Sequence, residues 1–227
     1  MSLVIATYNI HRCYGRSGFY DPHLTRQVLR DLNAQVIALQ EVELPHDAPD
    51  LLEFFCEGRP WQAIPGLTME RDSGHYGNAL LTSLPVRSVQ HIDLSLPRRE
   101  PRAALYVTLE HRARPLAVIA THLGLRAAER RSQVERLLDI LQREPTPPVT
   151  VLMGDLNEWF LWGRPLRRLR RHFDKSPAPA AFPACCPALA LDRIWVKPRD
   201  RLSAVETVRN TLTRAASDHL PVTGTLR

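Results

Sequence analysis

The pattern that most constrains the fold is a series of strand-like segments with no helix between them. Short apolar or alternating stretches occupy residues 78–81, 86–94, 103–109 and 116–120. Strands that follow one another through short turns pair antiparallel, whereas a doubly wound sheet needs a helix after each strand. A purely alternating fold is therefore excluded, and we expect an α+β protein in which mixed sheets pack against helices.

Helical spacing appears on both sides of that series. Apolar residues recur at helical intervals over 24–32, after Asp21-Pro22, and this segment lies between strand-like residues 3–9 and 36–40. Such an order indicates a strand-helix-strand unit at the start of the chain. Later on, we expect a long amphipathic helix over 126–143 and strands at 149–153, 194–196 and 221–226.

Composition places the chain among ordinary globular proteins. Of its 227 residues, 44% are hydrophobic and 24% are charged, which excludes disordered and collagen-like classes. We expect one domain over residues 1–227, with neither a membrane span nor a secretory signal. The four cysteines lack the spacing of a zinc site, and the adjacent pair Cys185-Cys186 is poorly placed to form a bridge. Reduced thiols and a cytoplasmic location follow as expectations.

Polar side chains suited to metal or phosphate chemistry stand beside the ends of the predicted strands. Loops that follow rigid strands commonly hold catalytic groups. A net charge of +6 also favours an anionic partner such as a phosphate ester. The candidates are Asn9, Glu41, His122, Asp155, Asn157, Asp192, Asp218 and His219.

Each candidate also has a purely structural interpretation when it is taken alone. Asparagine is common in turns, aspartate caps helices, and a histidine can be hydrogen-bonded in a core. Their occurrence together favours chemistry, because four carboxylates, two histidines and two asparagines supply what a magnesium-assisted attack of water on a phosphodiester requires.

Seven short blocks carry these candidates in a fixed order. They are Thr7-Tyr8-Asn9-Ile10, Leu39-Gln40-Glu41-Val42, Gly77-Asn78-Ala79-Leu80-Leu81, Thr121-His122-Leu123, Gly154-Asp155-Leu156-Asn157, Leu191-Asp192-Arg193-Ile194 and Ser217-Asp218-His219-Leu220-Pro221. This combination resembles the endonuclease/exonuclease/phosphatase superfamily over nearly the whole chain. Residues 8–16, Tyr20-Asp21-Pro22 and Phe182-Pro183 resemble a compact bacterial branch of mostly uncharacterised hydrolases. The resemblance implies a four-layer α/β/β/α sandwich of two mixed sheets flanked by helices, with the site at the sheet edge.

The resemblance also implies a divalent metal ion. Glu41 matches the principal ligand of Mg²⁺, which Mn²⁺ can replace, and carboxylate oxygens suit such hard cations. Asn9 and Asp218 would complete or orient that coordination.

Five further residues match catalytic positions of the superfamily. Asp155 would orient or deprotonate the attacking water, while Asn157 and His122 would donate to a phosphoryl oxygen. His219 would lie against the phosphate, with Asp192 fixing its tautomer and raising its pKa. A single in-line displacement without a covalent intermediate is expected.

Three positions are less determined by the pattern. Arg102 either clamps a phosphate or is an exposed arginine at a strand start, and Asn78 is expected to support the site from behind. The superfamily's nucleases pair the histidine at position 122 with an acid, and no carboxylate lies near residues 76–78. The remaining histidines are expected to be surface or structural: His11, His23, His46, His75, His91, His111 and His172.

The substrate is the open question. The arginine-rich residues 164–172 either follow a nucleic-acid backbone or form a solvated helix, and the aromatic residues nearby can stack bases, enter lipid or join the core. Those aromatic residues are Trp159, Phe160, Trp162 and Phe173.

Three functions are compatible with this sequence. The first is a magnesium-dependent phosphodiesterase acting on nucleic acid, a phospholipid head group or a small diester. The second is a phosphomonoesterase of the inositol-phosphatase type, and the third is a binding protein that kept the fold without the chemistry. No obligate protein partner is evident. The catalytic set argues against the third, and the short chain leaves little room for long DNA-gripping loops, which favours small or flexible substrates.

Overall fold

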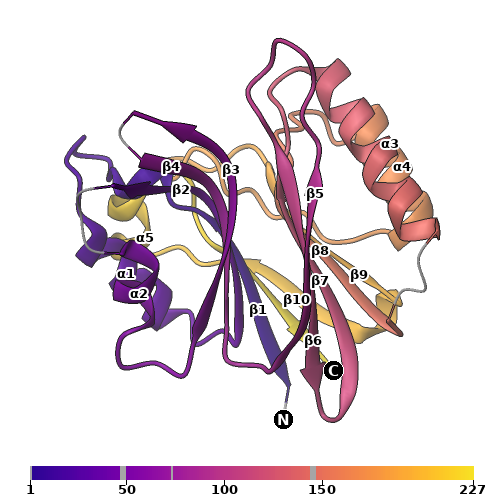
Figure 1. Ribbon diagram of the computed structural model, residues 1–227, viewed down its shortest axis with the longest axis horizontal. Helices are drawn as coiled ribbons and strands as arrows, with labels where there is room; N and C mark the ends of the chain where they lie inside the picture. The colour runs from indigo at the N-terminus through magenta and orange to yellow at the C-terminus, as the bar shows by residue number, and fades with distance from the viewer. Residues whose placement is uncertain (1, 47–49, 73, 144–146) are drawn as a thin grey trace.

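Two β-sheets lie face to face, with helices on both outer faces (Figure 1). The computed structural model describes residues 2–46, 50–72, 74–143 and 147–227. The first sheet has the order β10 (Leu202–Thr207), β11 (Val222–Leu226), β1 (Leu3–Asn9), β2 (Val36–Pro45), β4 (Gly74–Thr82) and β3 (Gln62–Arg71). The second has the order β5 (Val86–Asp93), β6 (Ala103–His111), β7 (Arg114–His122), β8 (Val149–Asp155) and β9 (Asp192–Lys197).

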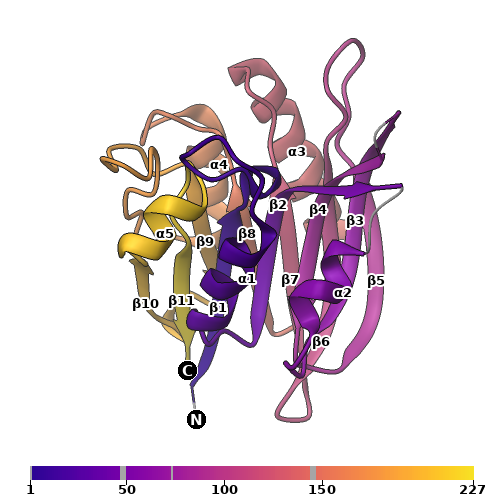
Figure 2. The ribbon, with the colours of Figure 1, turned by 90° about the vertical axis from the view of Figure 1, so that its left-hand side faces the viewer.

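Helices α1 (Pro22–Asp31), α2 (Leu51–Cys56) and α5 (Thr211–Ala216) cover the outer face of the first sheet (Figure 2). Helices α3 (Ala127–Arg143) and α4 (Arg164–Phe173) cover the second (Figure 1). Two short 3₁₀ turns, η1 (His11–Cys13) and η2 (Arg199–Arg201), complete the described elements. The predicted four-layer sandwich is confirmed.

Both sheets are mixed, as the sequence predicts. Strand β1 runs parallel to β2 and antiparallel to β11, with α1 connecting β1 to β2. Helix α1 begins where expected, because the Asp21 carboxylate accepts from the amide of Leu24 and Pro22 occupies the first turn. In the second sheet β5, β6 and β7 form an antiparallel series, α3 connects β7 to its parallel neighbour β8, and β9 closes the sheet antiparallel.

Three apolar clusters bind the layers together. The largest lies between the sheets, where β-branched side chains such as Val118 and Val151 face Ile5 and Val36. A second lies under α1 and α2, and a third lies under α3 and α4. Amphipathic helices bury one stripe each in this way, which explains the helical spacing in the sequence. No helix within the described ranges combines the length and apolarity needed to cross a bilayer.

The structure corrects several boundaries. Strand β2 was expected over residues 36–40 but continues through a bulge to Pro45. Strands β3 and β10 and helices α2 and α5 were not predicted. The four cysteines are free thiols, as predicted.

Candidate active site

Strand register places three predicted residues side by side in the second sheet. His122 at the end of β7 pairs with Asp155 at the end of β8, and Asp155 pairs with Asp192 at the start of β9. Side chains of directly paired residues project from the same face of a sheet. The residue before Asp155 must be glycine, because Gly154 has φ +149° and a Cβ there would collide with the carbonyl oxygen of Thr121.

Asn9 connects the two sheets. Its Nδ2 donates to Oε1 of Glu41 at 3.0 Å and to Oδ2 of Asp155 at 3.1 Å, while its Oδ1 accepts from the amide of His11 at 3.0 Å. Asn9 pairs with Gln40 across β1 and β2, and Glu41 follows in the bulge with φ 56°. The bulge therefore turns Glu41 toward the site, as bulges beside active sites commonly do.

His219 is held by a buried carboxylate. Its Nδ1 lies 2.8 Å from Oδ2 of Asp192, and its ring packs on Phe182 with centroids 4.7 Å apart. Burial disfavours the charged ring, but the charge of Asp192, its hydrogen bond and the nearby Asp155 outweigh burial and raise the pKa of His219 to about 10. The ring is therefore an imidazolium at neutral pH, with Nε2 3.8 Å from Oδ2 of Asp155.

The segment that carries His219 is fixed by a serine. Oγ of Ser217 donates to the backbone oxygen of Asn9 at 2.8 Å and accepts from the amide of His219 at 3.2 Å. Because this hydroxyl is buried and occupied on both sides, it serves as a structural link and not as a nucleophile.

His122 has the opposite character. Its Nδ1 lies 3.3 Å from Nη1 of Arg102 and its Nε2 lies 3.0 Å from Nδ2 of Asn157. Both neighbours are donors, so a protonated ring would satisfy neither of them, and a neutral ring can accept from only one. Burial, with the positive charges of Arg102 and His219, lowers the pKa of His122 to about 3 despite the opposing charge of Asp155.

The charges around His122 favour one tautomer. The charged guanidinium of Arg102 is the stronger donor, which favours acceptance at Nδ1 and places the single ring proton on Nε2, the nitrogen that faces a carboxylate. That nitrogen lies 3.6 Å from Oδ2 of Asp155. Arg102 therefore stands at the nitrogen of His122 where the resemblance to the superfamily's nucleases implies an acidic partner.

Asn157 belongs to the same network. Its amide N–H donates to Oδ1 of Asp155 at 2.9 Å, and its Nδ2 donates to the backbone oxygen of Leu123 at 2.9 Å. The residue has φ 50°, a left-handed conformation that asparagine tolerates better than most side chains. The Gly-Asp-x-Asn block therefore forms a turn in which Asp155 receives hydrogen bonds on both oxygens.

Arg102 is buried and not an exposed strand end. Its side chain is 7% exposed and its Nη1 lies 3.0 Å from Oε1 of Glu100. Asn78 lies behind it and donates from Nδ2 to the backbone oxygen of Ala103 at 3.2 Å. Asn78 therefore contacts the start of β6 next to Arg102 and is absent from the described lining of the cleft.

These side chains surround a cavity of about 380 Å³. Glu41, His122, Asp155, Asp218 and His219 line it, together with Asn157 and Arg102. Lining residues that sequence analysis did not assign to the site are Arg12, Arg71, Tyr76, Glu100, Leu125, Trp159, Phe182 and Leu191. Arg12, Arg71 and Arg102 give the cleft three guanidinium groups, which suit a phosphate.

Some of the unassigned residues have weak signals in the sequence. Arg12 and Phe182 stand in segments that resemble the bacterial branch, and Tyr76 precedes the Gly-Asn block. Arg71 has no recognisable pattern. His11 was expected to be surface or structural, but its Nδ1 lies 3.8 Å from Oδ1 of Asp218, whose side chain is 44% exposed.

The site contains donors suited to a divalent metal ion. Glu41 and Asp218 present carboxylates to the cavity, which are hard oxygen ligands of the type that Mg²⁺ and Mn²⁺ prefer. A buried group of Asp155, Asp192 and His219 also brings three ligand atoms within 4.8 Å of one another and can bind a metal. In that group, however, Asp192 and His219 already bind each other.

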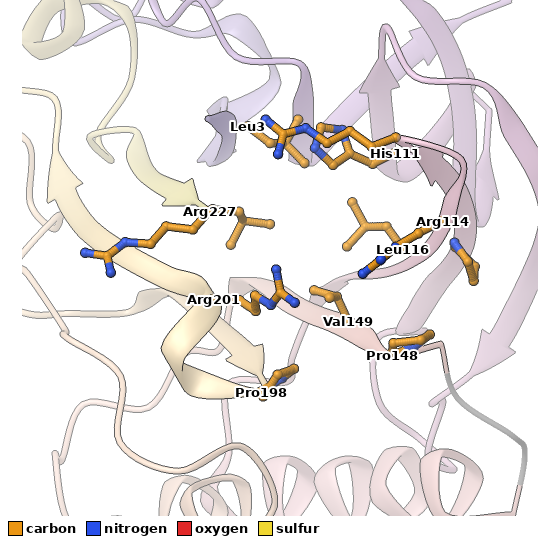
Figure 3. A pocket seen from close by; sticks show the side chains of 12 residues that line it. Leu3, His111, Arg114, Leu116, Pro148, Val149, Pro198, Arg201 and Arg227 are labelled. Atoms are coloured by element: carbon orange, nitrogen blue, oxygen red, sulfur yellow. The ribbon is translucent and has the colours of Figure 1, made fainter. Parts of the chain in front are cut away.

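A larger cavity of about 600 Å³ lies at the other ends of the same strands (Figure 3). Arg114 and Val149, which begin β7 and β8, line it, as does Leu3 at the start of β1. None of the described residues that line it carries a carboxylate side chain. The described lining of this cavity therefore lacks acidic side chains to hold a divalent cation, whereas the cleft around Asp155 has them.

Comparisons with known proteins agree with this geometry. The sequence profile described as the Endonuclease/Exonuclease/phosphatase family matches residues 6–219. The uncharacterised protein YbhP of Escherichia coli K12 is 28% identical over 242 residues, covering 97% of this chain and 94% of YbhP.

Solved structures share the fold. An endonuclease/exonuclease/phosphatase family protein from Leptotrichia buccalis superposes with a TM-score of 0.78 at 15% identity, covering 99% of each chain. A humanized D. rerio TDP2 superposes with a TM-score of 0.72 at 15% identity, covering 100% of this chain and 99% of that one. Members of the matched family are generally phosphoester hydrolases and typically need a divalent metal. With a profile match that spans nearly its whole length, the chain belongs to the endonuclease/exonuclease/phosphatase family.

Proposed function

We propose that this protein hydrolyses phosphodiesters with the help of Mg²⁺ or Mn²⁺, by in-line attack of water. The observation that carries the proposal is the surroundings of Asp155. Its Oδ2 accepts from Asn9 and lies near Nε2 of both His122 and His219, so one carboxylate meets a neutral ring and a charged ring. A base beside a fixed cation is what the activation of water at a phosphate requires.

Glu41 and Asp218 would hold the metal ion, with Asn9 orienting Glu41 through its 3.0 Å hydrogen bond. When bound, the metal neutralises phosphoryl charge and stabilises the leaving oxygen. Hydrogen bonds that orient ligand carboxylates commonly tune such sites. Asn9 therefore contributes to both the metal side and the base side of the cleft.

Asp155 would take the proton of the attacking water. As the new bond from water to phosphorus forms, the ester bond opposite it breaks and its electron pair leaves with the departing oxygen. His219 and Asp155 lie on the same side of the cleft, so the imidazolium of His219 stabilises an equatorial phosphoryl oxygen and does not protonate the leaving group. His122 and Asn157 would donate to the phosphoryl oxygens from their Nε2 and Nδ2 atoms.

Residues 1–227 would act as one catalytic domain, because both sheets contribute to the site. Asn9 and Glu41 come from the first sheet and His219 precedes its strand β11, whereas His122, Asp155 and Asp192 come from the second sheet. Four free thiols favour a reducing compartment such as the cytoplasm. Both statements remain predictions.

Hydrolysis of simple aryl esters tests the proposal. Purified protein is incubated with a bis-aryl phosphodiester and, separately, an aryl phosphomonoester, in Mg²⁺, Mn²⁺ or EDTA. We expect metal-dependent release of the aryl alcohol from the diester and none in EDTA. Cleavage of the monoester alone would instead support a phosphatase, and metal-independent cleavage would contradict the proposed site.

A further inference from the structure

Large apolar side chains are exposed beside the cleft. Trp159, Phe160, Leu161 and Trp162 are consecutive, and they are 60%, 58%, 49% and 67% exposed. Leu125, from the loop after β7, is 70% exposed. Leu125 and Trp159 line the same cavity as Asp155. We call these five residues the apolar rim; a contiguous exposed patch of this kind marks an interaction surface.

The rim is fixed in position by a buried ion pair. Nε of Arg130 lies 3.2 Å from Oε2 of Glu158, and both side chains are nearly fully buried. Arg130 also donates to the backbone oxygen of Leu125, and Glu158 accepts from the amide of Phe160 through Oε1. One ion pair therefore anchors both loops of the rim.

Such an ion pair is costly to bury. Gly163 ends the loop where a Cβ would collide with the carboxyl group of Glu158, so the backbone is fitted closely around this pair. The exposure of the rim is therefore a built feature of the fold and does not result from a loose loop.

Arginines flank the rim. Helix α4 follows it directly, and Arg164, Arg167 and Arg171 are exposed on that helix. Nη1 of Arg167 donates to the backbone oxygen of Trp162 at 2.9 Å. Arg126, next to Leu125, is exposed as well. Tryptophan and leucine side chains with adjacent arginines are typical of protein surfaces that enter the interface of an anionic bilayer.

A nucleic-acid strand fits this surface less well. Bases stack on aromatic faces, but Leu125 and Leu161 offer no aromatic face. A hydrocarbon interior, by contrast, accepts aliphatic and aromatic side chains alike. The composition of the rim therefore favours lipid.

We propose that the apolar rim inserts into the surface of an anionic lipid bilayer and brings the cleft to the phosphodiester of a phospholipid head group. This proposal rests on the proposed phosphodiesterase function and names its substrate class. Water supplies the oxygen that bonds to phosphorus and passes one proton to Asp155, while one ester bond breaks. The leaving oxygen takes up a proton from solvent and Asp155 releases its proton to solvent, so the products are a phosphomonoester and an alcohol.

Vesicle binding by an inactive variant tests the proposal without depending on hydrolysis. Asp155→Asn protein is sedimented with vesicles of phosphatidylglycerol and phosphatidylcholine in equal amounts, and with vesicles of phosphatidylcholine alone. Two further proteins carry Asp155→Asn together with other substitutions. One adds Phe160→Ser and Trp162→Ser in the rim, and the other adds Val89→Ser. Val89 is an exposed apolar residue on β5 and serves as the matched control. Far-UV circular dichroism checks that each protein is folded.

We expect binding to the anionic vesicles, a loss of about tenfold or more in the double rim variant as apolar burial is removed, and no loss in the Val89 variant. The tryptophan fluorescence maximum should shift to shorter wavelength on binding, because Trp159 and Trp162 would move from water into lipid. Trp61 and Trp195 are buried in the protein and should not contribute to the shift. In the active protein, the ratio of vesicle-lipid to soluble-diester hydrolysis should fall with the same rim variant.

Three results would overturn the proposal: no binding of Asp155→Asn to anionic vesicles, equal binding by the rim variant, or rim-dependent binding of a single-stranded oligonucleotide in place of vesicles. Failure of the proposed function has a different signature. In that case no ester is hydrolysed, while vesicle binding still depends on the rim.

Discussion

His122 and His219 face the same oxygen of Asp155, but the ring of His122 is neutral and the ring of His219 is positively charged. Their Nε2 atoms lie 3.6 Å and 3.8 Å from Oδ2 of that carboxylate. The ring of His219 is charged because Asp192 binds its other nitrogen, and the ring of His122 is neutral because it is buried and the charged Arg102 lies at its other nitrogen. Two histidines in one cleft thus have different tasks, set by the partner behind each ring.

Replacing Asp192 with asparagine should remove the carboxylate that keeps the ring of His219 charged. The pKa of His219, about 10 in the native protein, should fall toward its ordinary value, because the carboxylate charge that stabilises the imidazolium is removed. We expect diester hydrolysis to fall about 10²-fold at pH 8, with the alkaline limb of the pH–rate profile displaced to lower pH. A profile of kcat/KM between about pH 6 and pH 10 checks this. An unchanged alkaline limb would show that His219 has no charged role.

Stability should respond to the two histidines in separate pH ranges. The pKa of His122 in the folded protein, about 3, lies below its ordinary value of 6.5, so the unfolded chain alone takes up this proton as pH falls below 6.5. The native state loses stability there, by at most about 1.4 kcal/mol per pH unit for one proton. His219, with a folded pKa of about 10, contributes stability that is complete below pH 6.5 and is lost as pH rises toward 10.

Urea denaturation in EDTA at several pH values tests both ranges. His122→Gln should reduce the dependence of the unfolding free energy on pH between pH 6.5 and 3 and leave its dependence above pH 6.5 unchanged. Asp192→Asn should reduce the dependence above pH 6.5 and leave the acidic dependence unchanged. If His122→Gln changed the unfolding free energy only above pH 6.5, the assigned charge states of the two histidines would be wrong.

Removing the Asn9 side chain should weaken metal binding. Asn9→Ala loses the hydrogen bonds to Glu41 and Asp155, and loss of such an orienting group commonly lowers metal affinity by about 10- to 100-fold. Calorimetric titration with Mn²⁺ measures the change. Asn33→Gly is the control, since Asn33 is an exposed residue after α1 with φ 48° that glycine adopts freely. Equal affinities in the two variants would contradict the role of Asn9.

The Arg130–Glu158 pair should be far more important for stability than a surface pair. Arg130→Met leaves a buried carboxylate without its partner and should cost about 3–5 kcal/mol of unfolding free energy. Arg87→Ala breaks the exposed pair with Glu110 and should cost under about 1 kcal/mol. Urea denaturation of the two variants gives the comparison. Similar losses would mean that the buried pair does not hold the loops.

The elements that sequence analysis found are those with a strong local period. Helix α3 shows an apolar stripe over 17 residues, and the central strands are continuous apolar runs. Strand β3 lies at the edge of its sheet and contains Pro65 and Gly66, which an edge position tolerates but which mask a strand pattern. Strand β10 is the other edge, and α2 and α5 have six residues each, too few for a helical period to be visible.

The polar ends of buried strands were visible in the sequence, so the main site residues could be predicted. What local pattern cannot give is how distant segments meet. The contact of Arg102 with His122 depends on the pairing of β6 with β7, and Arg71 reaches the cleft from β3, which was itself not predicted. His11 comes within 3.8 Å of Asp218 because residues 11–13 all have positive φ, which turns the chain back beside that residue.

The central claim is that Asp155 is the base of a metal-dependent phosphodiesterase. The most direct measurement is kcat/KM for a bis-aryl phosphodiester in Mg²⁺, compared between wild type, Asp155→Asn and Asp139→Asn. Asp139 is exposed on α3 and loses the same charge away from the cleft. We predict a fall of about 10²-fold or more for Asp155→Asn and no change for Asp139→Asn. Metal-dependent hydrolysis that is equally fast in wild type and Asp155→Asn would contradict the account.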